Sequence, residues 1–178
     1  MKFRRIPETL GILKNWNRCW VLLGTVLLIP ALAIAEQNVC SEQSNAIVVR
    51  VQGRHLYLCE DRKATSLYRV SLGRGGVGKH SYRDLKTPTG RYPLGVPRDS
   101  ERFHIFIPIG YPTADQKREG YTGQDVGIHG PSPRFKWAGP MNAWFGWTAG
   151  CIATATDKEI ESIAAWVRKT GAATIIIE

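Results

Sequence analysis

The sequence lacks several patterns that identify large classes of protein. It shows no internal repeat and no stretch of linker composition, which argues against a repeat architecture and a second domain. It carries no nucleic-acid recognition motif. Its four histidines are His55, His80, His104 and His129. Their spacing from one another and from the cysteines does not match a metal site, so we expect no bound metal.

A membrane-spanning length of apolar sequence is also missing. The longest apolar run, residues 20–35, has 16 residues and contains Pro30, whereas a helical span needs about 20. Five basic residues precede the run, which ends in the small-residue pattern Ala33-Ile34-Ala35. This arrangement is typical of a cleaved secretory signal peptide, with a short membrane anchor as the alternative. We therefore expect residues 1–35 to direct export to the periplasm or cell envelope, leaving no stable membrane span after cleavage.

Acidic residues are scarce relative to basic ones, with 15 against 24 and a formal net charge of +9. Residues 1–35 hold five of the basic residues and one acid, Glu8, so their removal lowers the net charge to +5. The remaining 143 residues are enough to bury one core. The residual charge suits an anionic polymer such as a cell wall, or a membrane surface. Nucleic acid is a poor match for an exported chain without a recognition motif.

Cysteine is rare in the part expected after cleavage, which holds Cys40, Cys59 and Cys151. An odd number of cysteines in an oxidising compartment leaves one thiol unpaired. The simplest division pairs Cys40 with Cys59 and leaves Cys151 free, although cysteine spacing alone does not determine the connectivity.

Short segments of alternating apolar residues predict a mainly β domain over residues 46–178, preceded by an N-terminal segment at 36–45. We expect seven or eight strands in a sandwich or barrel-like arrangement of mixed sheets, at residues 46–51, 55–59, 66–72, 90–95, 103–107, 126–129, 151–153 and 173–177. One α-helix is predicted in the C-terminal region. Thr156 and Glu159 form a capping box at its start, and Gly171 ends it.

Two loops have unusual compositions. Residues 73–80 nearly match a phosphate-binding loop, but His80 stands where Ser or Thr is needed and no helical pattern follows, which argues against nucleotide binding. A second loop, residues 131–145, and the residues just after it are rich in aromatic side chains. These either plug the core beneath the loop or form a wall for a sugar or peptide substrate. They are Trp137, Trp144, Phe145 and Trp147.

His129 and Cys151 stand 22 positions apart, each next to a glycine. A thiol attacks as its thiolate, which needs a nearby base or cation, and a histidine beside it supplies that base. Gly150 would let the backbone approach a substrate closely, and the amides of residues 149–151 would face a developing oxyanion. An isolated pair of this kind is more often structural, so its interpretation depends on the surrounding motif.

The segments around this pair resemble the L,D-transpeptidase catalytic domain family of the YkuD type. His129-Gly130 and the later Thr-Ala-Gly-Cys-Ile of residues 148–152 are similar to the family's His-Gly and Ser/Thr-x-Gly-Cys-Ile/Val segments. Residues 86–92, Lys-Thr-Pro-Thr-Gly-Arg-Tyr, resemble its Thr-Pro-x-Gly-x-Phe/Tyr segment. Ala149 and Ala153 replace a histidine and an arginine of many members, which resembles a divergent Thr-Ala-Gly-Cys-Ile-Ala branch.

The resemblance implies an enzyme acting on peptidoglycan, with Cys151 as nucleophile and His129 as proton acceptor and donor. The Gly130 carbonyl would orient the imidazole, and the amides of Gly150 and Cys151 would hold the oxyanion. No metal or organic cofactor is implied. The candidates for substrate binding are Arg134, Thr148 and Trp147, with Arg74 and Lys79 as further cations placed in loops.

Three functions remain open from the sequence. A transpeptidase would pass an acyl group from a tetrapeptide stem to an amine of a second stem peptide or of a wall-linked lipoprotein. A hydrolase with the same machinery would trim stems as an L,D-carboxypeptidase, or cut a peptidoglycan–protein amide. A wall-binding module would keep Cys151 merely buried. The motifs favour the first, in cell-wall organisation and cell shape.

Overall fold

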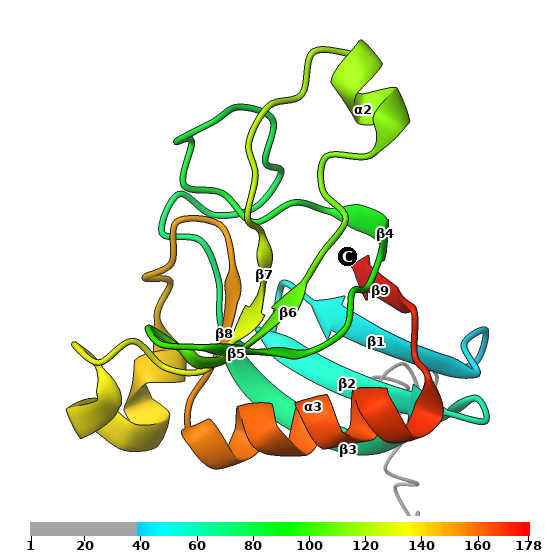
Figure 1. Ribbon diagram of the computed structural model, residues 1–178, viewed down its shortest axis with the longest axis vertical. Coiled ribbons are helices and arrows are strands. Elements are labelled where there is room, and N and C mark those ends of the chain that lie inside the picture. Colours follow the sequence, from blue (N-terminus) through cyan, green and yellow to red (C-terminus); the bar gives the residue numbers. More distant parts are fainter. Residues whose placement is uncertain (1–38) are drawn as a thin grey trace, which may run out of the picture. The chain divides into compact units, whose positions relative to one another are not determined.

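The chain folds around one curled, mixed sheet of nine strands (Figure 1). The structure is a computed structural model that describes residues 39–178, so the predicted signal peptide lies outside the described residues. The strands are β1 (Asn45–Arg50), β2 (His55–Glu60), β3 (Lys63–Ser71), β4 (Gly90–Pro93), β5 (Arg98–Ser100), β6 (His104–Pro108), β7 (Gly127–His129), β8 (Ile152–Thr154) and β9 (Thr174–Ile177). The helical elements are α2 (Ala114–Arg118), the 3-10 segment η1 (Lys136–Trp144) and α3 (Asp157–Thr170).

The order of the strands is β4-β9-β1-β2-β3-β8-β7-β6-β5. Antiparallel hairpins join β1 to β2 and β2 to β3. The second hairpin turns on Asp61 and Arg62, whose φ values of 49° and 63° match a two-residue turn with both residues left-handed. β3 then serves both halves of the sheet, because Val70 and Ser71 at its end pair with β8. This pairing joins β8, and through it β7, to the half of the sheet that contains the hairpins of β1, β2 and β3.

The sheet curls so that the residues just after the edge strand β4 meet the end of β6 and the residues that follow it. The Gly95 amide donates to the Pro108 carbonyl at 2.8 Å, and the Gly110 amide donates to the Pro93 carbonyl at 2.8 Å. These hydrogen bonds close the curl and enclose a core of aliphatic side chains from both halves. The predicted mainly β, barrel-like arrangement of mixed sheets is confirmed.

Helix α3 covers one side of the core, as predicted. Thr156 and Glu159 form both hydrogen bonds of the capping box, and Gly171 ends the helix in the left-handed conformation at φ 65°. The buried face consists of Ile160, Ile163, Ala164 and Val167. A local capping signal and an apolar stripe therefore suffice to define this helix.

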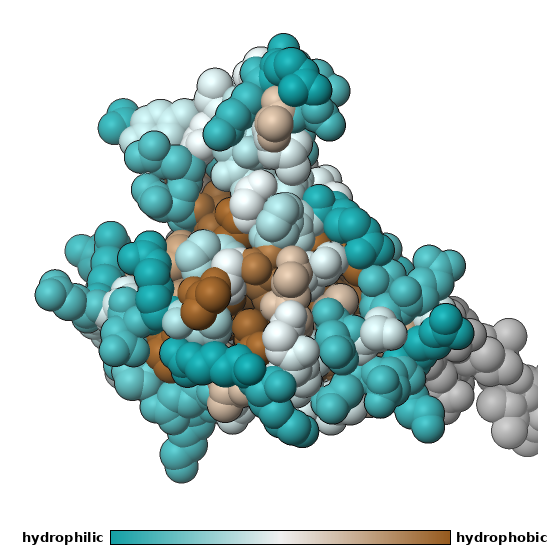
Figure 2. All heavy atoms as spheres, turned by 45° about the vertical axis from the view of Figure 1, so that its right-hand side comes forward, coloured by the Kyte–Doolittle hydropathy of each residue, from teal (hydrophilic) through white to brown (hydrophobic). Residues whose placement is uncertain are grey.

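Three elements lie in segments that the pattern left irregular. β5 is only three residues long and polar, so it has no alternating apolar signal. Helix α2 has its own capping box, Thr113 with Gln116, but buries no residue. In agreement, Figure 2 shows hydrophilic side chains over the projection that carries it. η1 lies inside the predicted loop 131–145 and is interrupted at Gly139 (φ 51°) and Pro140. The expectation of a single helix was therefore incomplete.

The predicted disulfide is present. Cys40 and Cys59 are bonded, and Cys151 is the free cysteine of residues 39–178. The bridge lies in a small second core with Val39, Val48 and Tyr57 on the outer side of β1 and β2. Among residues 39–178, none of the helices has the length and apolar character needed to cross a membrane.

Candidate active site

The parallel pairing of β7 with β8 brings the two motif segments together in the middle of the sheet (Figure 1). Ile128 lies opposite Ile152, and both are fully buried in the core. Because side chains alternate along a strand, His129 and Cys151 project from the other face of the sheet. His129 lies opposite Ala153, so Cys151 is displaced by two residues along the neighbouring strand. The fold therefore places the predicted base and nucleophile on one face of adjacent strands.

The turn before Cys151 is held by Thr148. Its hydroxyl donates to the Cys151 carbonyl at 2.6 Å and accepts the Gly150 amide at 3.1 Å. Thr148 is buried, at 3% exposure, so it shapes the turn and is not available as the substrate contact that we expected. The Gly150 amide is likewise engaged inside the turn, which counts against its predicted part in an oxyanion hole. A role for the Cys151 amide stays a prediction.

Gly150 is required for a reason other than the one the sequence indicated. Its φ of 133° lies in the region that favours glycine, and a Cβ there would stand 2.7 Å from the Lys86 carbonyl oxygen. The close approach is thus to a loop of the same chain. It seats the loop 73–86 against the cysteine turn.

The His129 ring is fixed and buried. Its Nδ1 lies 2.6 Å from the Gly130 carbonyl oxygen, the contact that the resemblance implied. Because a carbonyl only accepts, Nδ1 carries the hydrogen and Nε2 is left with its lone pair. The Phe103 ring stacks on the imidazole with 3.9 Å between the ring centroids. The Trp147 ring is tilted relative to the imidazole, with 5.9 Å between the centroids. The imidazole is therefore held in one tautomer and one orientation.

Burial sets the protonation state of His129. Desolvation lowers the pKa of the imidazole from 6.5 to about 4, with the Gly130 hydrogen bond opposing this shift and the charge of Arg102 adding to it. At neutral pH the ring is uncharged. It can accept a proton, as a general base must.

The Cys151 thiol is reduced, partly exposed and uncharged at rest. It donates to the Asp125 carbonyl at 3.4 Å. Burial raises the pKa of the thiol, as does the charge of Asp125, while the Gly127 amide and the charge of Lys79 lower it. Within residues 39–178 no hydrogen bond joins this thiol to the His129 ring. The thiol therefore has to turn away from the Asp125 carbonyl before it can pass its proton to the imidazole.

Cys151 opens into a pocket of about 200 Å³. Charged side chains lie there beside the apolar Leu85, Val126 and Ala149, and the loops 79–85 and 123–126 form two of its walls. Lys79 lines this pocket, as does Arg83, which the sequence did not single out. Arg74 and Arg134 are exposed and do not line it. Only Lys79 among the predicted cations therefore lies where a substrate bound at the thiol would pass.

The aromatic residues of the loop 131–145 and just after it do not form the core plug that was one of the two roles left open by the sequence. The Trp147 indole donates to the Asn142 carbonyl at 3.1 Å and packs near His129, so it supports the base and does not line the thiol pocket. Trp137, Trp144 and Phe145 are exposed on η1 and just after it, at 82%, 63% and 44%. They do not plug the core.

The remaining histidines lie apart from the thiol pocket. His104 pairs with Glu161 at 2.6 Å, His55 packs edge-on against Tyr57, and His80 is exposed. No group of three or more histidine, cysteine or acidic side chains in residues 39–178 is placed to hold a metal ion. The near match to a phosphate-binding loop at residues 73–80 is followed by bends and turns, without a helix.

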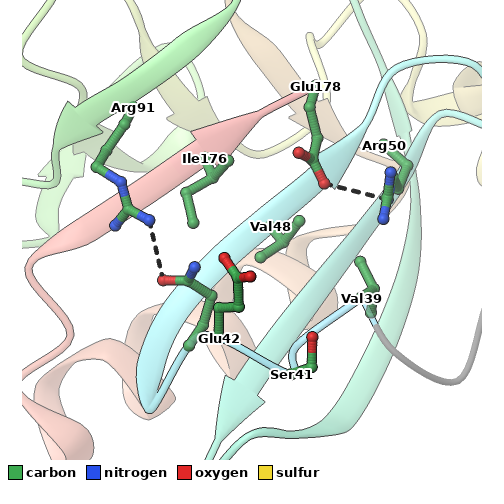
Figure 3. A pocket seen from close by; sticks show the side chains of 9 residues that line it. Val39, Ser41, Glu42, Val48, Arg50, Arg91, Ile176 and Glu178 are labelled. Carbon is green, nitrogen blue, oxygen red and sulfur yellow. Dashed lines mark hydrogen bonds and ion pairs between the residues drawn. The ribbon is translucent and has the colours of Figure 1, made fainter.

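A larger cavity, of about 290 Å³, lies on the outer side of β1 and β9 (Figure 3). Its rim carries an ion pair and a hydrogen bond from an arginine to a neutral amide. Arg50 contacts Glu178 at 3.3 Å, and Arg91 donates to Gln43 at 3.3 Å. No thiol and no imidazole line it. Although it is larger, it offers no nucleophile, so the smaller pocket at Cys151 is the better candidate.

The family profile described as the L,D-transpeptidase catalytic domain (YkuD) matches residues 44–177. The crystal structure of the helical cell shape determining protein Pgp2 from Campylobacter jejuni is 23% identical, with a TM-score of 0.59 over 83% of this chain and 53% of that one. Bdellovibrio bacteriovorus Bd1075 is 22% identical, with a TM-score of 0.54 over 80% of this chain and 51% of that one. The chain thus spans about half the length of these similar structures, and the likeness shows a shared fold. Curated proteins gave no match.

Proposed function

This chain belongs to the L,D-transpeptidase catalytic domain family, and from that premise we propose that it is a cysteine-dependent acyltransferase of the bacterial cell wall. The observation that carries the proposal is the placement of Cys151 and His129. A free thiol at a pocket and an oriented, uncharged imidazole project from one face of two adjacent parallel strands. Export of the chain by residues 1–35 to the periplasm or envelope is part of the same proposal.

The first half of the reaction forms a thioester. The Cys151 sulfur attacks the carbonyl carbon of the third residue of a tetrapeptide stem, while the thiol proton passes to Nε2 of His129. The amide bond to the terminal D-alanine then breaks, and the departing amine takes that proton from the imidazolium. The Gly130 carbonyl holds Nδ1 throughout, so Nε2 both receives and returns the proton.

The second half transfers the acyl group. An amine of a second stem peptide attacks the thioester carbonyl, the C–S bond breaks and the amine proton returns to the sulfur by way of the imidazole. The product is a cross-link, and the free thiol is restored. An amine of a wall-linked lipoprotein is an alternative acceptor, and water in place of an amine gives carboxypeptidase activity. All three share the same acyl-enzyme.

A second candidate, a non-catalytic wall-binding domain, is favoured by one observation. The thiol donates its hydrogen bond to the Asp125 carbonyl and not to the imidazole. A chain that had lost the reaction would show the same contact. Reactivity of the sulfur therefore separates the two candidates better than its position does.

The test is to incubate the protein with purified muropeptides that carry tetrapeptide stems and to analyse the products by mass spectrometry. Cross-linked dimers that have lost one D-alanine are expected. Shortened monomers without dimers would show that the protein hydrolyses the stem and does not cross-link it. Unchanged muropeptides would leave wall binding as the function. The same products from Cys151→Ala would contradict the cysteine mechanism and place the reaction on another side chain.

A further inference from the structure

Beside the thiol pocket lies an ion pair that the reaction as described does not use. Lys79 Nζ contacts Asp84 Oδ1 at 2.7 Å, with the two side chains 4% and 17% exposed. A buried ion pair loses much of its attraction to the cost of removing two charges from water, so it is weak evidence of a purely stabilising role. Charged groups buried beside a nucleophile instead point to the control of its chemistry.

Asp84 is the centre of the loop that forms one wall of the pocket. Its Oδ2 accepts the amides of His80 and Ser81 at 2.8 and 2.9 Å, and its Oδ1 accepts the Lys86 amide at 3.1 Å. Burial alone raises the pKa of this carboxyl, but the Lys79 side chain and the three amides together hold it well below its usual range. The carboxylate is therefore ionised at any working pH and ties both ends of the loop together.

The lysine is confined between two glycines. A Cβ at Gly123 would lie 2.9 Å from Lys79 Cε, and one at Gly150 would lie 3.7 Å from Lys79 Cδ. The Tyr111 hydroxyl donates to the Lys79 carbonyl at 3.1 Å, and Nζ also donates to the Ser81 carbonyl. The side chain thus runs through a narrow slot directly beside the cysteine turn. Its position is set by contacts on every side.

The titratable groups around the thiol come from three elements. The loop 79–85 supplies Lys79, Arg83 and the phenol of Tyr82, and the segment before β7 supplies Asp125. His129 stands on β7 and is uncharged at neutral pH. Lys79 lowers the pKa of the thiol and Asp125 raises it. Of these two opposing charges, the lysine is the buried one.

We propose that the Lys79–Asp84 pair is a positioning element of the thiol site, in which Asp84 fixes the loop and Lys79 holds a positive charge beside Cys151. This charge favours the thiolate at the moment the proton leaves the sulfur. Its part in turnover rests on the proposed function. Its effect on the thiol does not, because the reactivity of the sulfur can be measured without any substrate.

The experiment measures the rate at which iodoacetamide alkylates Cys151 as a function of pH, read on the Cys151 peptide by mass spectrometry. Lys79→Met is expected to raise the midpoint of the profile and to slow alkylation at pH 7 about three- to tenfold. Lys79→Arg keeps the charge and should restore most of the rate. Lys136→Met is the matched control, because it breaks a 2.7 Å ion pair with Asp157 that is half-exposed and outside the pocket.

The direction in which a second variant changes the alkylation rate distinguishes an effect of charge from simple damage to the loop. Asp84→Asn leaves the lysine charge unbalanced and should speed alkylation at pH 7, whereas a collapsed loop would move both variants in the same direction. An unchanged profile in folded Lys79→Met overturns the proposal, as does slower alkylation in Asp84→Asn. If Lys79→Met does not fold, Asp84→Asn decides alone. Altered alkylation combined with inert muropeptides would contradict the proposed function and leave this inference standing.

Discussion

The two cavities described above contain charged residues in different settings. In the larger one, Arg50 and Glu178 pair at 3.3 Å with each side chain 47% exposed. At the thiol pocket, Lys79 and Asp84 pair at 2.7 Å with exposures of 4% and 17%. Water screens the charges of the exposed pair. The charges of the buried pair are screened less, so they interact more strongly with neighbouring groups. The comparison teaches that the placement of buried charge beside a free nucleophile is a better guide to the candidate site than cavity volume.

The strongest test of this contrast is the removal of the nucleophile. Cys151→Ala should abolish product formation from muropeptides, because it removes the free thiol of residues 39–178, the proposed nucleophile. Its stability should change by less than about 1 kcal/mol, since the lost sulfur is partly exposed. Product analysis by mass spectrometry and a denaturant melt measure the two effects. Retained turnover would move the reaction away from this pocket.

Loss of the base should have the next largest effect. His129→Gln keeps a polar side chain of similar volume but cannot accept the thiol proton, so turnover should fall about 10²- to 10⁴-fold. Initial rates of D-alanine release provide the measurement. His80→Gln, at an exposed histidine, is the control and should leave the rate unchanged. Equal rates in the two variants would contradict the assignment of His129 as base.

Breaking the two ion pairs compares the cavities directly. Asp84→Ala leaves the buried Lys79 charge and three loop amides without their acceptor, and should lower the free energy of unfolding by about 3 kcal/mol. Glu178→Ala removes a half-exposed partner of Arg50 and should cost less than about 1 kcal/mol. Urea denaturation at pH 7 measures both. Similar losses would show that burial does not distinguish the pairs.

The uncharged His129 predicts a dependence of stability on pH. The unfolded imidazole binds its proton near pH 6.5 and the folded one near pH 4, so the unfolded state holds more protons between these values. Stability is therefore complete above pH 6.5 and is lost as the pH falls toward 4. From pH 7 to 4.5 the loss should be about 2 kcal/mol. Urea melts at both pH values should show this loss in the wild type, and His129→Gln should lack it.

The smallest effect is expected at the larger cavity. Arg91→Gln removes a cation that contacts Gln43 at its rim, far from any nucleophile. Turnover should stay within about twofold of the wild type, since exposed polar contacts of this kind contribute little. Rates of D-alanine release with muropeptides provide the check. A large loss of turnover would mean that this cavity takes part in substrate binding.

Features defined by nearby residues were predictable from the sequence. Helix α3 could be placed to the residue because Thr156, Glu159 and Gly171 act within one turn of its ends. The strands β7 and β8 could be identified from their motifs. The presence of one unpaired thiol followed from the odd number of cysteines, and the simplest division, Cys40 with Cys59, is the one found. In each case the deciding interactions were local or followed from a count.

Features defined by distant contacts were not predictable. Thr148 was expected to face substrate, but its hydroxyl closes the turn that it shares with Gly150 and Cys151. Gly150 needs its small size because Lys86, 64 positions earlier, packs against it. Asp84 gave one signal, because it is the one acid in the basic, glycine-rich loop 73–86, but its partners become known only when the loop is folded.

The central claim is that Cys151 attacks the stem peptide, and the direct measurement is the mass of the Cys151 peptide after a short incubation with a tetrapeptide-stem donor and acid quenching. The account predicts a thioester adduct on Cys151, equal to the donor minus D-alanine, that is absent from Cys151→Ala. An unmodified Cys151 in protein whose thiol still reacts with iodoacetamide would contradict it.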